Sequence, residues 1–275
     1  MCFLYSLQIF LYFFYFLLSF ITFADLSNLI FSASETMFYK SEAIVLNQVK
    51  YGDGKLIVNM LTEDVGRVSF IVSLAKTARG KMKRQLFQPL TIINVEFDYR
   101  PTADLQHLRD VHFSAVYSSI PFSAGKISIA FFLSEFLSHS TRMMTPDAGL
   151  YQFVRSSLLF LDTIDSGFAN FHIVFMLRMT QFLGIFPDVG TYDEGCFFDL
   201  RDGIFVRFVP SHSDFLPPAE AKVFHNLMRL TFSSMHLFAT SRSERNLIAE
   251  AIVNYYRLHV PSFSELQSLS VLREL

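Results

Sequence analysis

The sequence predicts an α+β protein in which a five-stranded barrel of the oligonucleotide-binding (OB) type precedes a helical bundle with a small inserted β-hairpin. Short segments rich in Val, Ile, Phe and Thr alternate with turn residues up to residue 113, and beyond residue 121 apolar residues recur at helical spacing. Of the 275 residues, 51% are hydrophobic and 17% are charged, which excludes a disordered chain. We therefore expect an OB domain over residues 37–115 and a helical domain over residues 116–275.

The predicted barrel consists of short segments separated by turn-forming residues. The segments span residues 42–49, 55–62, 67–74, 90–99 and 105–113. Asp53-Gly54 predicts a tight hairpin turn between the first two, and Gly66 stands where the next turn needs a positive backbone φ. Five short strands at this spacing favour the OB fold, although an SH3-like barrel would have a similar pattern.

Three helices are predicted directly after the barrel. Residues 126–139 are apolar on almost every side, which predicts a helix buried within a bundle rather than one on its surface. Apolar residues at helical spacing predict two more helices, over residues 150–164 and 168–182, the last of which ends before Gly184 and Pro187.

The remaining chain predicts an inserted hairpin followed by three helices. The hairpin spans residues 196–206, because two apolar runs flank the turn pair Asp202-Gly203. The helices are recognised by their start signals, which are Pro217-Pro218 for a helix to about Phe238, a capping box of Ser241 and Glu244, and the same spacing in Ser262 and Glu265.

The first 36 residues form an apolar extension that precedes the two predicted domains. Residues 1–24 carry no charge and, as a helix, would be about 36 Å long, enough to cross a bilayer. No Lys or Arg occurs before Lys40, however, so the basic flank of a signal peptide or anchor is missing. We expect that translation starts at Met37, and the alternative is that residues 3–23 are a membrane anchor.

No motif of a known catalytic or metal site occurs in the chain. The patterns GxSxG, HExxH and GxxxxGK[ST] are absent, and the eight histidines lack the spacing of paired metal ligands. Cys2 and Cys196 are the only cysteines, too few for a disulfide framework or a cysteine zinc site. We therefore expect a cytoplasmic protein that is not an enzyme and has no cofactor, metal or small-molecule substrate.

A basic loop between the third and fourth predicted strands is the candidate functional site. The loop carries no acidic residue, and it joins two strands of a predicted OB barrel, where loops flank the nucleic-acid face. Gly80 would allow the backbone to approach a phosphate closely. These features favour phosphate binding over a loop that is only solvated. The predicted nucleic-acid contacts are Lys76, Arg79, Lys81, Lys83 and Arg84, together with Arg67 on the preceding strand.

Base stacking would require exposed aromatic side chains close to this loop. Phe70, Phe87, Phe97 and Tyr99 are the candidates, although strand alternation is expected to direct about half of them into the core.

Several segments, taken in order, resemble the RecO family of bacterial DNA repair proteins. Residues 40–97 resemble its opening strand, T-E-x-x-G hairpin, basic loop and Gln-Pro strand. The segment LRMTQFLGIFPDV at 177–189 resembles the central helix of the family, which ends in Leu-Gly-x-x-Pro. Residues 255–275 resemble the carboxy-terminal segment of Bacteroidetes-type members.

The resemblance implies a recombination mediator without catalytic activity. Such proteins bind single- and double-stranded DNA, anneal complementary strands and, with RecR, help to load recombinase onto strands coated by single-strand-binding protein. The acidic, apolar C-terminal tail of that coating protein is a further implied partner, and a nucleoid-associated location is implied as well. The alternative is a membrane-tethered interaction protein that uses residues 3–23 as an anchor and the basic loop to contact anionic lipid.

One departure from the family concerns zinc. Some members carry a four-cysteine zinc site after the Leu-Gly-x-x-Pro helix, whereas only Cys196 lies in this region of the chain. We therefore expect no zinc, and a hairpin held by packing of Phe197, Phe198, Ile204 and Phe205.

Overall fold

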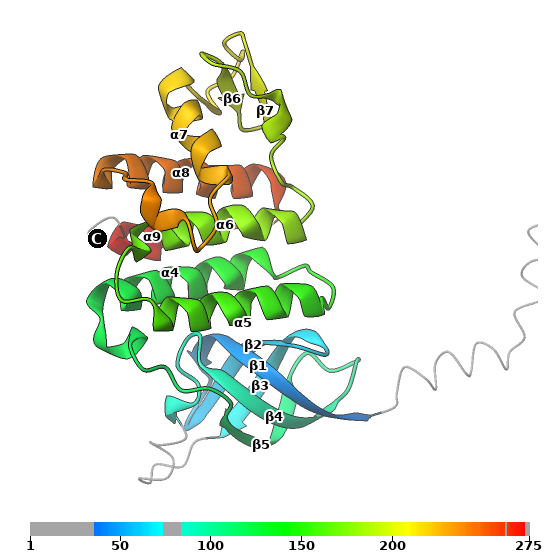
Figure 1. Ribbon diagram of the computed structural model, residues 1–275. Coiled ribbons are helices and arrows are strands. Elements are labelled where there is room, and N and C mark those ends of the chain that lie inside the picture. The colour runs from blue at the N-terminus through cyan, green and yellow to red at the C-terminus, as the bar shows by residue number, and fades with distance from the viewer. Residues whose placement is uncertain (1–35, 74–83, 262, 273–275) are drawn as a thin grey trace, which may run out of the picture.

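A computed structural model of the protein describes residues 36–73, 84–261 and 263–272. The barrel lies at one end of the molecule, the helices are stacked on it in layers, and the inserted hairpin lies at the opposite end (Figure 1). Within these ranges no helix combines the length and apolarity needed to cross a bilayer. The alternative anchor, residues 3–23, lies outside the described residues. Of the extension over residues 1–36, only residue 36 is described.

The predicted five-stranded barrel is confirmed. Its strands are β1 (Met37–Lys50), β2 (Lys55–Thr62), β3 (Gly66–Ser73), β4 (Ile92–Tyr99) and β5 (Gln106–Phe113). They form a closed barrel in the order β1-β2-β3-β5-β4, in which β3 and β5 run parallel and the other pairs run antiparallel.

The length of β1 closes the barrel. Residues 37–44 of this strand pair with β4, and residues 43–50 pair with β2 on the other side. A register shift between Val45 and Asn47 marks a bulge, which bends a strand and increases its twist. The sequence pattern predicted only residues 42–49 of this strand, because the alternation of apolar and polar residues is weak at its exposed start.

The helical domain contains six α-helices within the described ranges. They are α4 (Ala124–Ser140), α5 (Ala148–Thr163), α6 (Phe171–Phe182), α7 (Pro218–Met228), α8 (Arg242–His259) and α9 (Ser268–Leu272). Short 3-10 turns occur at η1 (Ile120–Phe122), η2 (Phe168–Asn170), η3 (Val189–Thr191) and η4 (Met235–Leu237). As predicted for an all-round apolar helix, α4 is covered on several sides, because it contacts β1, α6 and α9.

The barrel and the helices share a continuous hydrophobic core. Ile44, Leu46 and Leu61, which point outward from the barrel, are buried in the same cluster as Phe132, Phe136 and the other core residues of the helices. A second, separate cluster fills the barrel interior. The two parts of the molecule are therefore packed against each other through apolar side chains.

Two predicted helices differ from those observed. The helix from Pro218 ends at Met228 instead of continuing to about Phe238. The chain turns away just beyond it, where the Thr231 N–H donates to Ser234 Oγ at 2.9 Å instead of continuing the helical hydrogen-bond pattern. The last helix begins at Ser268 rather than just after residue 262, because its first N–H groups are capped by Glu135 of α4.

The predicted hairpin is present and gains a third strand. It is formed by β6 (Phe197–Asp199) and β7 (Ile204–Val206), and β8 (Phe215–Leu216) pairs with β6 on its other side. Phe198 and Phe205 are buried, whereas Phe197 and Ile204 are half-buried. The ring of Phe198 lies 4.6 Å from that of Phe224 in α7, so packing joins the hairpin to the helices.

Candidate nucleic-acid interface

The end of the barrel that carries the basic loop is defined by β1, β2 and β3. Lys55, the first residue of β2, pairs with Ser73, the last residue of β3, and Tyr51 donates its backbone N–H to the Lys55 carbonyl at 3.0 Å. The basic loop leaves β3 directly after Ser73. Its origin is therefore next to the turn that joins β1 and β2.

Four of the predicted contacts, Lys76, Arg79, Lys81 and Lys83, lie outside the described residues. Arg84, the fifth residue of the run, is the first described residue after the loop and is exposed. The chain then enters the barrel core at once, because Leu86 and Phe87 are buried. Ser73 and Arg84, the described residues on either side of the loop, are both exposed.

The outer surface of β1, β2 and β3 carries an uncovered apolar row next to the loop. Val49 pairs with Ile57, which pairs with Ile71, and residues directly opposite each other on neighbouring strands point to the same face. Val49 is 57% exposed, and Ile57 and Ile71 are half-buried. We call this row, together with Lys55 and Tyr51, the open face.

The neighbouring row of the same surface is polar and belongs to the contact with the helices. Ser69 donates to Asn59 Oδ1 at 2.6 Å, Asn59 donates to Asn47 Oδ1 at 2.7 Å, and Asn47 donates to Ser138 Oγ in α4 at 2.9 Å. This chain of hydrogen bonds joins the polar row to α4, whereas Val49 in the open face stays 57% exposed.

Arg67 lies at the contact with the helices rather than on the open face. Its Nη1 donates to the Ser138 carbonyl, and the side chain is half-buried. Burial, together with the positive charge of nearby Arg142, lowers the pKa of Arg67. The structure therefore gives this predicted contact a role in joining β3 to α4.

The predicted stacking residues lie mostly in the barrel core. Phe70, Phe87 and Phe97 are fully buried, and Tyr99 is half-buried against Phe97. The prediction that only about half of these four aromatic side chains would lie in the core was therefore wrong. Tyr51, which is 51% exposed beside Lys55, is the aromatic side chain at the loop end that sequence reasoning missed. The signal was its position in the turn segment Tyr-Gly-Asp-Gly between two lysines.

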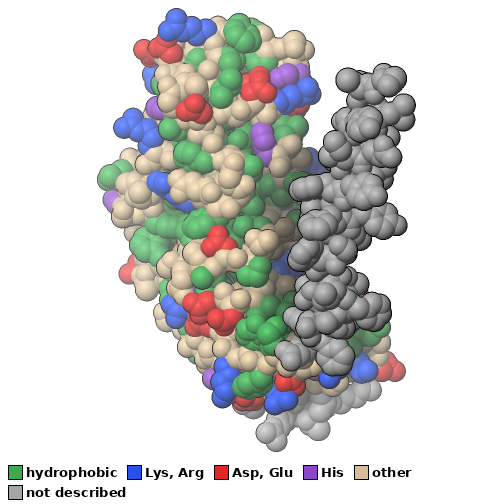
Figure 2. Space-filling model, turned by 90° about the vertical axis from the view of Figure 1, so that its right-hand side faces the viewer, with side chains coloured by type: hydrophobic (Ala, Val, Ile, Leu, Met, Phe, Trp, Pro, Cys, Tyr) green, Lys and Arg blue, Asp and Glu red, His purple; other side chains and the backbone are tan. Residues whose placement is uncertain are grey.

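Three exposed cations lie close to the basic loop in the chain or on the neighbouring turn. Lys50, Lys55 and Arg84 are exposed, and none is ion-paired with a carboxylate among the described residues. In contrast, Lys40 and Arg109 form ion pairs with carboxylates of β4, at 2.7 and 2.6 Å. On the side of the molecule seen in Figure 2, basic and acidic side chains over the barrel are likewise interspersed. Lys50, Lys55 and Arg84 therefore add positive charge that could contact phosphates to this part of the barrel.

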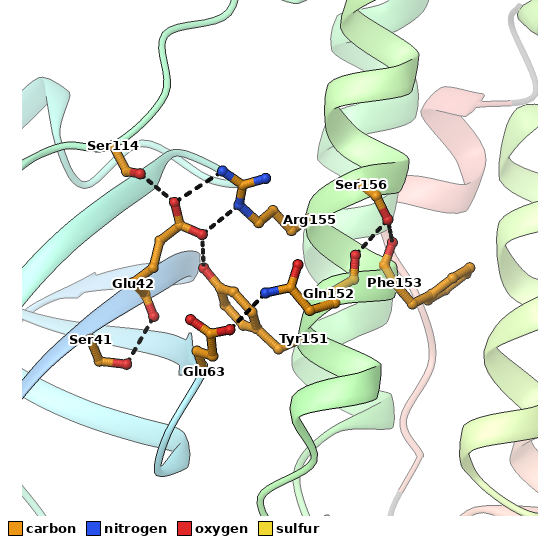
Figure 3. Close-up of polar contacts among 9 residues, drawn as sticks. All are labelled: Ser41, Glu42, Glu63, Ser114, Tyr151, Gln152, Phe153, Arg155 and Ser156. Carbon is orange, nitrogen blue, oxygen red and sulfur yellow. Dashed lines mark hydrogen bonds and ion pairs between the residues drawn. The ribbon is translucent and has the colours of Figure 1, made fainter.

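A polar joint holds β1 of the barrel against α5 (Figure 3). Glu42 of β1 accepts hydrogen bonds from Arg155 Nε at 2.5 Å, from Tyr151 Oη at 3.0 Å and from Ser114 Oγ. Partial burial alone would raise the pKa of Glu42, but the hydrogen bonds from Arg155, Ser114 and Tyr151 outweigh it and the pKa is lowered. Gln152 donates to Glu63 at 2.6 Å beside this joint.

The hairpin region offers no cluster of metal ligands within the described residues. Cys196 is a buried free thiol. His212 Nε2 lies 3.2 Å from Asp199, and the Asp199 carboxylate also accepts the Arg201 N–H at 2.9 Å. These contacts stabilise the turn of the hairpin, and they engage the His212 and Asp199 side chains with protein groups.

The fold and the loop end define a two-part protein of the OB-fold class, in which a barrel with unpaired cations is joined to a helical domain. The family model described as "Recombination protein O N terminal" matches residues 37–117, and "Recombination protein O C terminal" matches residues 122–268. The chain belongs to the RecO family of DNA repair proteins.

Relatives named DNA repair protein RecO support this assignment. The protein of Phocaeicola vulgatus is 41% identical over 239 residues, which are 87% of this chain and 99% of the relative. The protein of Bacteroides fragilis is 40% identical over 240 residues, with the same coverage. The protein of Flavobacterium psychrophilum is 31% identical over 237 residues, or 86% of this chain and 98% of the relative.

Proposed function

We propose that the protein is a recombination mediator that binds and anneals single-stranded DNA through the open face and the basic loop. The observation that carries the proposal is the pairing of Lys55 with Ser73, which brings the origin of the basic loop next to Tyr51 and the uncovered apolar row. Cations can then contact successive phosphates while bases lie against Tyr51 and the apolar side chains. Contacts of this kind carry little sequence specificity.

Annealing follows from the same arrangement. Two complementary strands repel each other through their phosphates, and a surface that neutralises part of this charge lowers the repulsion. Because backbone contacts leave base edges free, a second strand can still pair with the first. Double-stranded DNA would bind through phosphate contacts alone.

The partners proposed for this role are RecR and the acidic, apolar C-terminal tail of single-strand-binding protein. Family membership supports them, because a mediator must reach strands that the coating protein already covers. Binding of a fluorescent tail peptide, compared with a scrambled peptide of the same composition, tests the second partner. Co-sedimentation with purified RecR tests the first, and absence of a complex in either assay would restrict the proposal to DNA.

Salt dependence of DNA binding tests the proposed site. If five cations each contact a phosphate of a single strand, log K should fall with log salt with a slope of about −3 to −4. Changing Arg79, Lys81, Lys83 and Arg84 to Gln should reduce the slope to about −1 and abolish strand annealing. A matched variant with Arg207, Lys222, Arg229 and Arg257 changed to Gln removes the same charge from the helical domain and should bind DNA like the unmodified protein.

The comparison of these two variants decides the assignment. Equal loss of affinity in both would show that net charge rather than the basic loop governs binding. Anionic vesicles added as a competing polyanion provide a second check. If they displace DNA completely at low lipid concentration, a lipid-facing role for the loop would have to replace the proposed one.

A further inference from the structure

A groove at the far end of the molecule from the barrel has no role in the proposed DNA binding. It lies between the inserted hairpin, α7, α8 and the C-terminal segment, and has a volume of about 470 Å³. A second hollow of about 240 Å³ between α7 and the start of α8 adjoins it, because Glu220 and Leu247 line both. The two hollows therefore adjoin along α7 and α8, and we refer to them together as the groove.

The groove follows one face of α8. Glu244, Leu247, Ala251, Asn254 and Arg257 line it at intervals of three or four residues, the spacing of a single helical face. The distance from Glu244 to Arg257 along the helix is about 20 Å at 1.5 Å per residue. A helix of about 14 residues would match this length.

Part of the groove lining is apolar. Leu216, Ala251 and Leu266 are buried beneath it, and Leu247 and Leu269 form its walls, with Leu247 38% exposed. If an apolar side chain of a partner entered here, both that side chain and the apolar lining would be removed from water. Such burial is the main source of affinity when an amphipathic helix docks in a groove.

The charges that line the groove are predominantly negative. Among the described residues, the charged side chains that line it are Glu220, Glu244, Glu250, Glu265 and one cation, Arg257. Arg257 and Glu265 offset each other, because Arg257 Nη2 lies 3.9 Å from the Glu265 carboxylate, and the other three glutamates leave the lining net negative. Two cations beside the groove are also engaged, Arg201 with Asp214 at 2.7 Å and Lys222 with Glu194 at 3.1 Å. A phosphate backbone would be repelled here, whereas Lys and Arg side chains would be attracted.

We propose that this groove docks a short cationic amphipathic helix of a partner protein, with its apolar face on α8 and its Lys or Arg side chains against the glutamates of the rim. The groove lies on the hairpin, α7, α8 and the C-terminal segment, which are separated from the barrel by other helices (Figure 1). A partner held there would leave the DNA site free, so the protein would connect that partner to DNA. The proposal does not depend on the DNA-binding function.

The test uses a fluorescent 14-residue peptide with Leu at helical spacing on one face and Lys on the other. Its affinity for the full chain is measured by anisotropy, and a peptide with Glu in place of Lys is the negative probe. The groove variant changes Glu220, Glu250 and Glu265 to Gln. The matched variant changes Asp53, Asp64 and Asp104 of the barrel, all of which are exposed, to Asn. Both variants remove the same charge.

We expect the groove variant to bind the Lys peptide at least tenfold more weakly, and the barrel variant to stay within twofold of the unmodified protein. Leu247→Ser should weaken binding severalfold, and hydrogen exchange should slow in α7 and α8 when the peptide is bound. DNA affinity should stay unchanged in all groove variants, which separates this proposal from that of the DNA site.

Three outcomes would overturn the proposal. The first is an equal loss of affinity in the groove and barrel variants, and the second is tight binding of the Glu peptide. The third is self-association of the protein alone that the groove variant abolishes, because the occupant would then be a second copy of the chain. Thermal unfolding of each variant shows whether it is folded, and Leu247→Ser provides an independent test if the triple variant is not.

Discussion

Glu42 of the first strand and Arg155 of α5 form an ion pair with a 2.5 Å contact between Oε2 and Nε, and this pair joins the barrel to the helical domain (Figure 3). The two side chains are only 13% and 32% exposed. Tyr151 and Ser114 donate to the same carboxylate, so removal of one partner leaves polar groups unsatisfied at a packed boundary.

Loss of this pair should destabilise the whole protein. We expect Glu42→Gln and Arg155→Met each to lower the free energy of unfolding by about 1–3 kcal/mol, because each leaves the other partner without its counter-charge. In the double variant the effects should be less than additive by more than about 0.5 kcal/mol. Urea unfolding followed by circular dichroism measures all three values, and strict additivity would contradict a direct coupling.

Because of Asp162 in α5, the free energy of unfolding should depend on pH in the acid range. Burial would raise the pKa of its carboxyl, but the N–H groups of Ser118, Ile120 and Ser119 and the Ser118 hydroxyl lower it to about 2, against an ordinary value of 3.8. A carboxyl with a depressed folded-state pKa adds stability that is present above pH 3.8 and is lost as the pH falls toward 2.

Asp162→Asn should remove this part of the acid dependence. The difference in unfolding free energy between the unmodified protein and the variant should be constant above about pH 5 and shrink steadily below about pH 4. Urea titrations at several pH values measure the difference.

Gly66 should tolerate a side chain poorly. Its φ is +73°, as the turn required, and an added Cβ would lie 3.0 Å from the Cα of Pro146. We expect Gly66→Ala to cost about 2 kcal/mol through backbone strain and this contact. Gly52, with a φ of +60° and open space around it, is the matched position, and Gly52→Ala should cost about 1 kcal/mol. Equal thermal shifts would show that the contact with Pro146 is unimportant.

Tyr51 should contribute to binding of single strands. Because stacking on an aromatic side chain stabilises a bound base by about 1–3 kcal/mol, Tyr51→Ala should weaken binding about tenfold without changing the salt slope. Phe122 is 84% exposed in the helical domain, and Phe122→Ala is the control. Titration of a fluorescent oligothymidine measures both. An altered slope with Tyr51→Ala would indicate a lost phosphate contact instead.

The inserted hairpin should be stable without metal. Dialysis against a chelator should leave the melting temperature unchanged, and elemental analysis should find no stoichiometric zinc. Phe198→Ala, in contrast, should lower the free energy of unfolding by about 3–5 kcal/mol, because the fully buried ring packs on Phe205 and Phe224. A chelator effect comparable with that of Phe198→Ala would contradict the prediction.

Local patterns predicted most of the fold. The alternation of apolar residues located the strands of the barrel within a few residues, except at the start of β1, and helical spacing located α4, α5 and α6. The capping box of Ser241 and Glu244 is present with both of its hydrogen bonds. These features could be predicted because they depend on residues that are close together in the chain.

Contacts between distant segments could not be predicted in this way. Arg67 looked like one more cation beside the basic loop, yet it bonds to a carbonyl 71 residues away. The start of α9 depends on Glu135, whose carboxylate accepts the backbone N–H of Gln267, 132 residues later in the chain. Phe87 belongs to the barrel core although no strand alternation applies to it.

By itself, the sequence determined the order of strands and helices, the acid-free charge of the basic loop and the resemblance to the RecO family. Only the tertiary structure decided that Lys55 lies opposite Ser73, that Arg67 joins β3 to α4, and which aromatic side chains stay exposed. The reason is physical: propensity and periodicity act within a few residues, whereas strand register and helix packing decide which distant side chains meet.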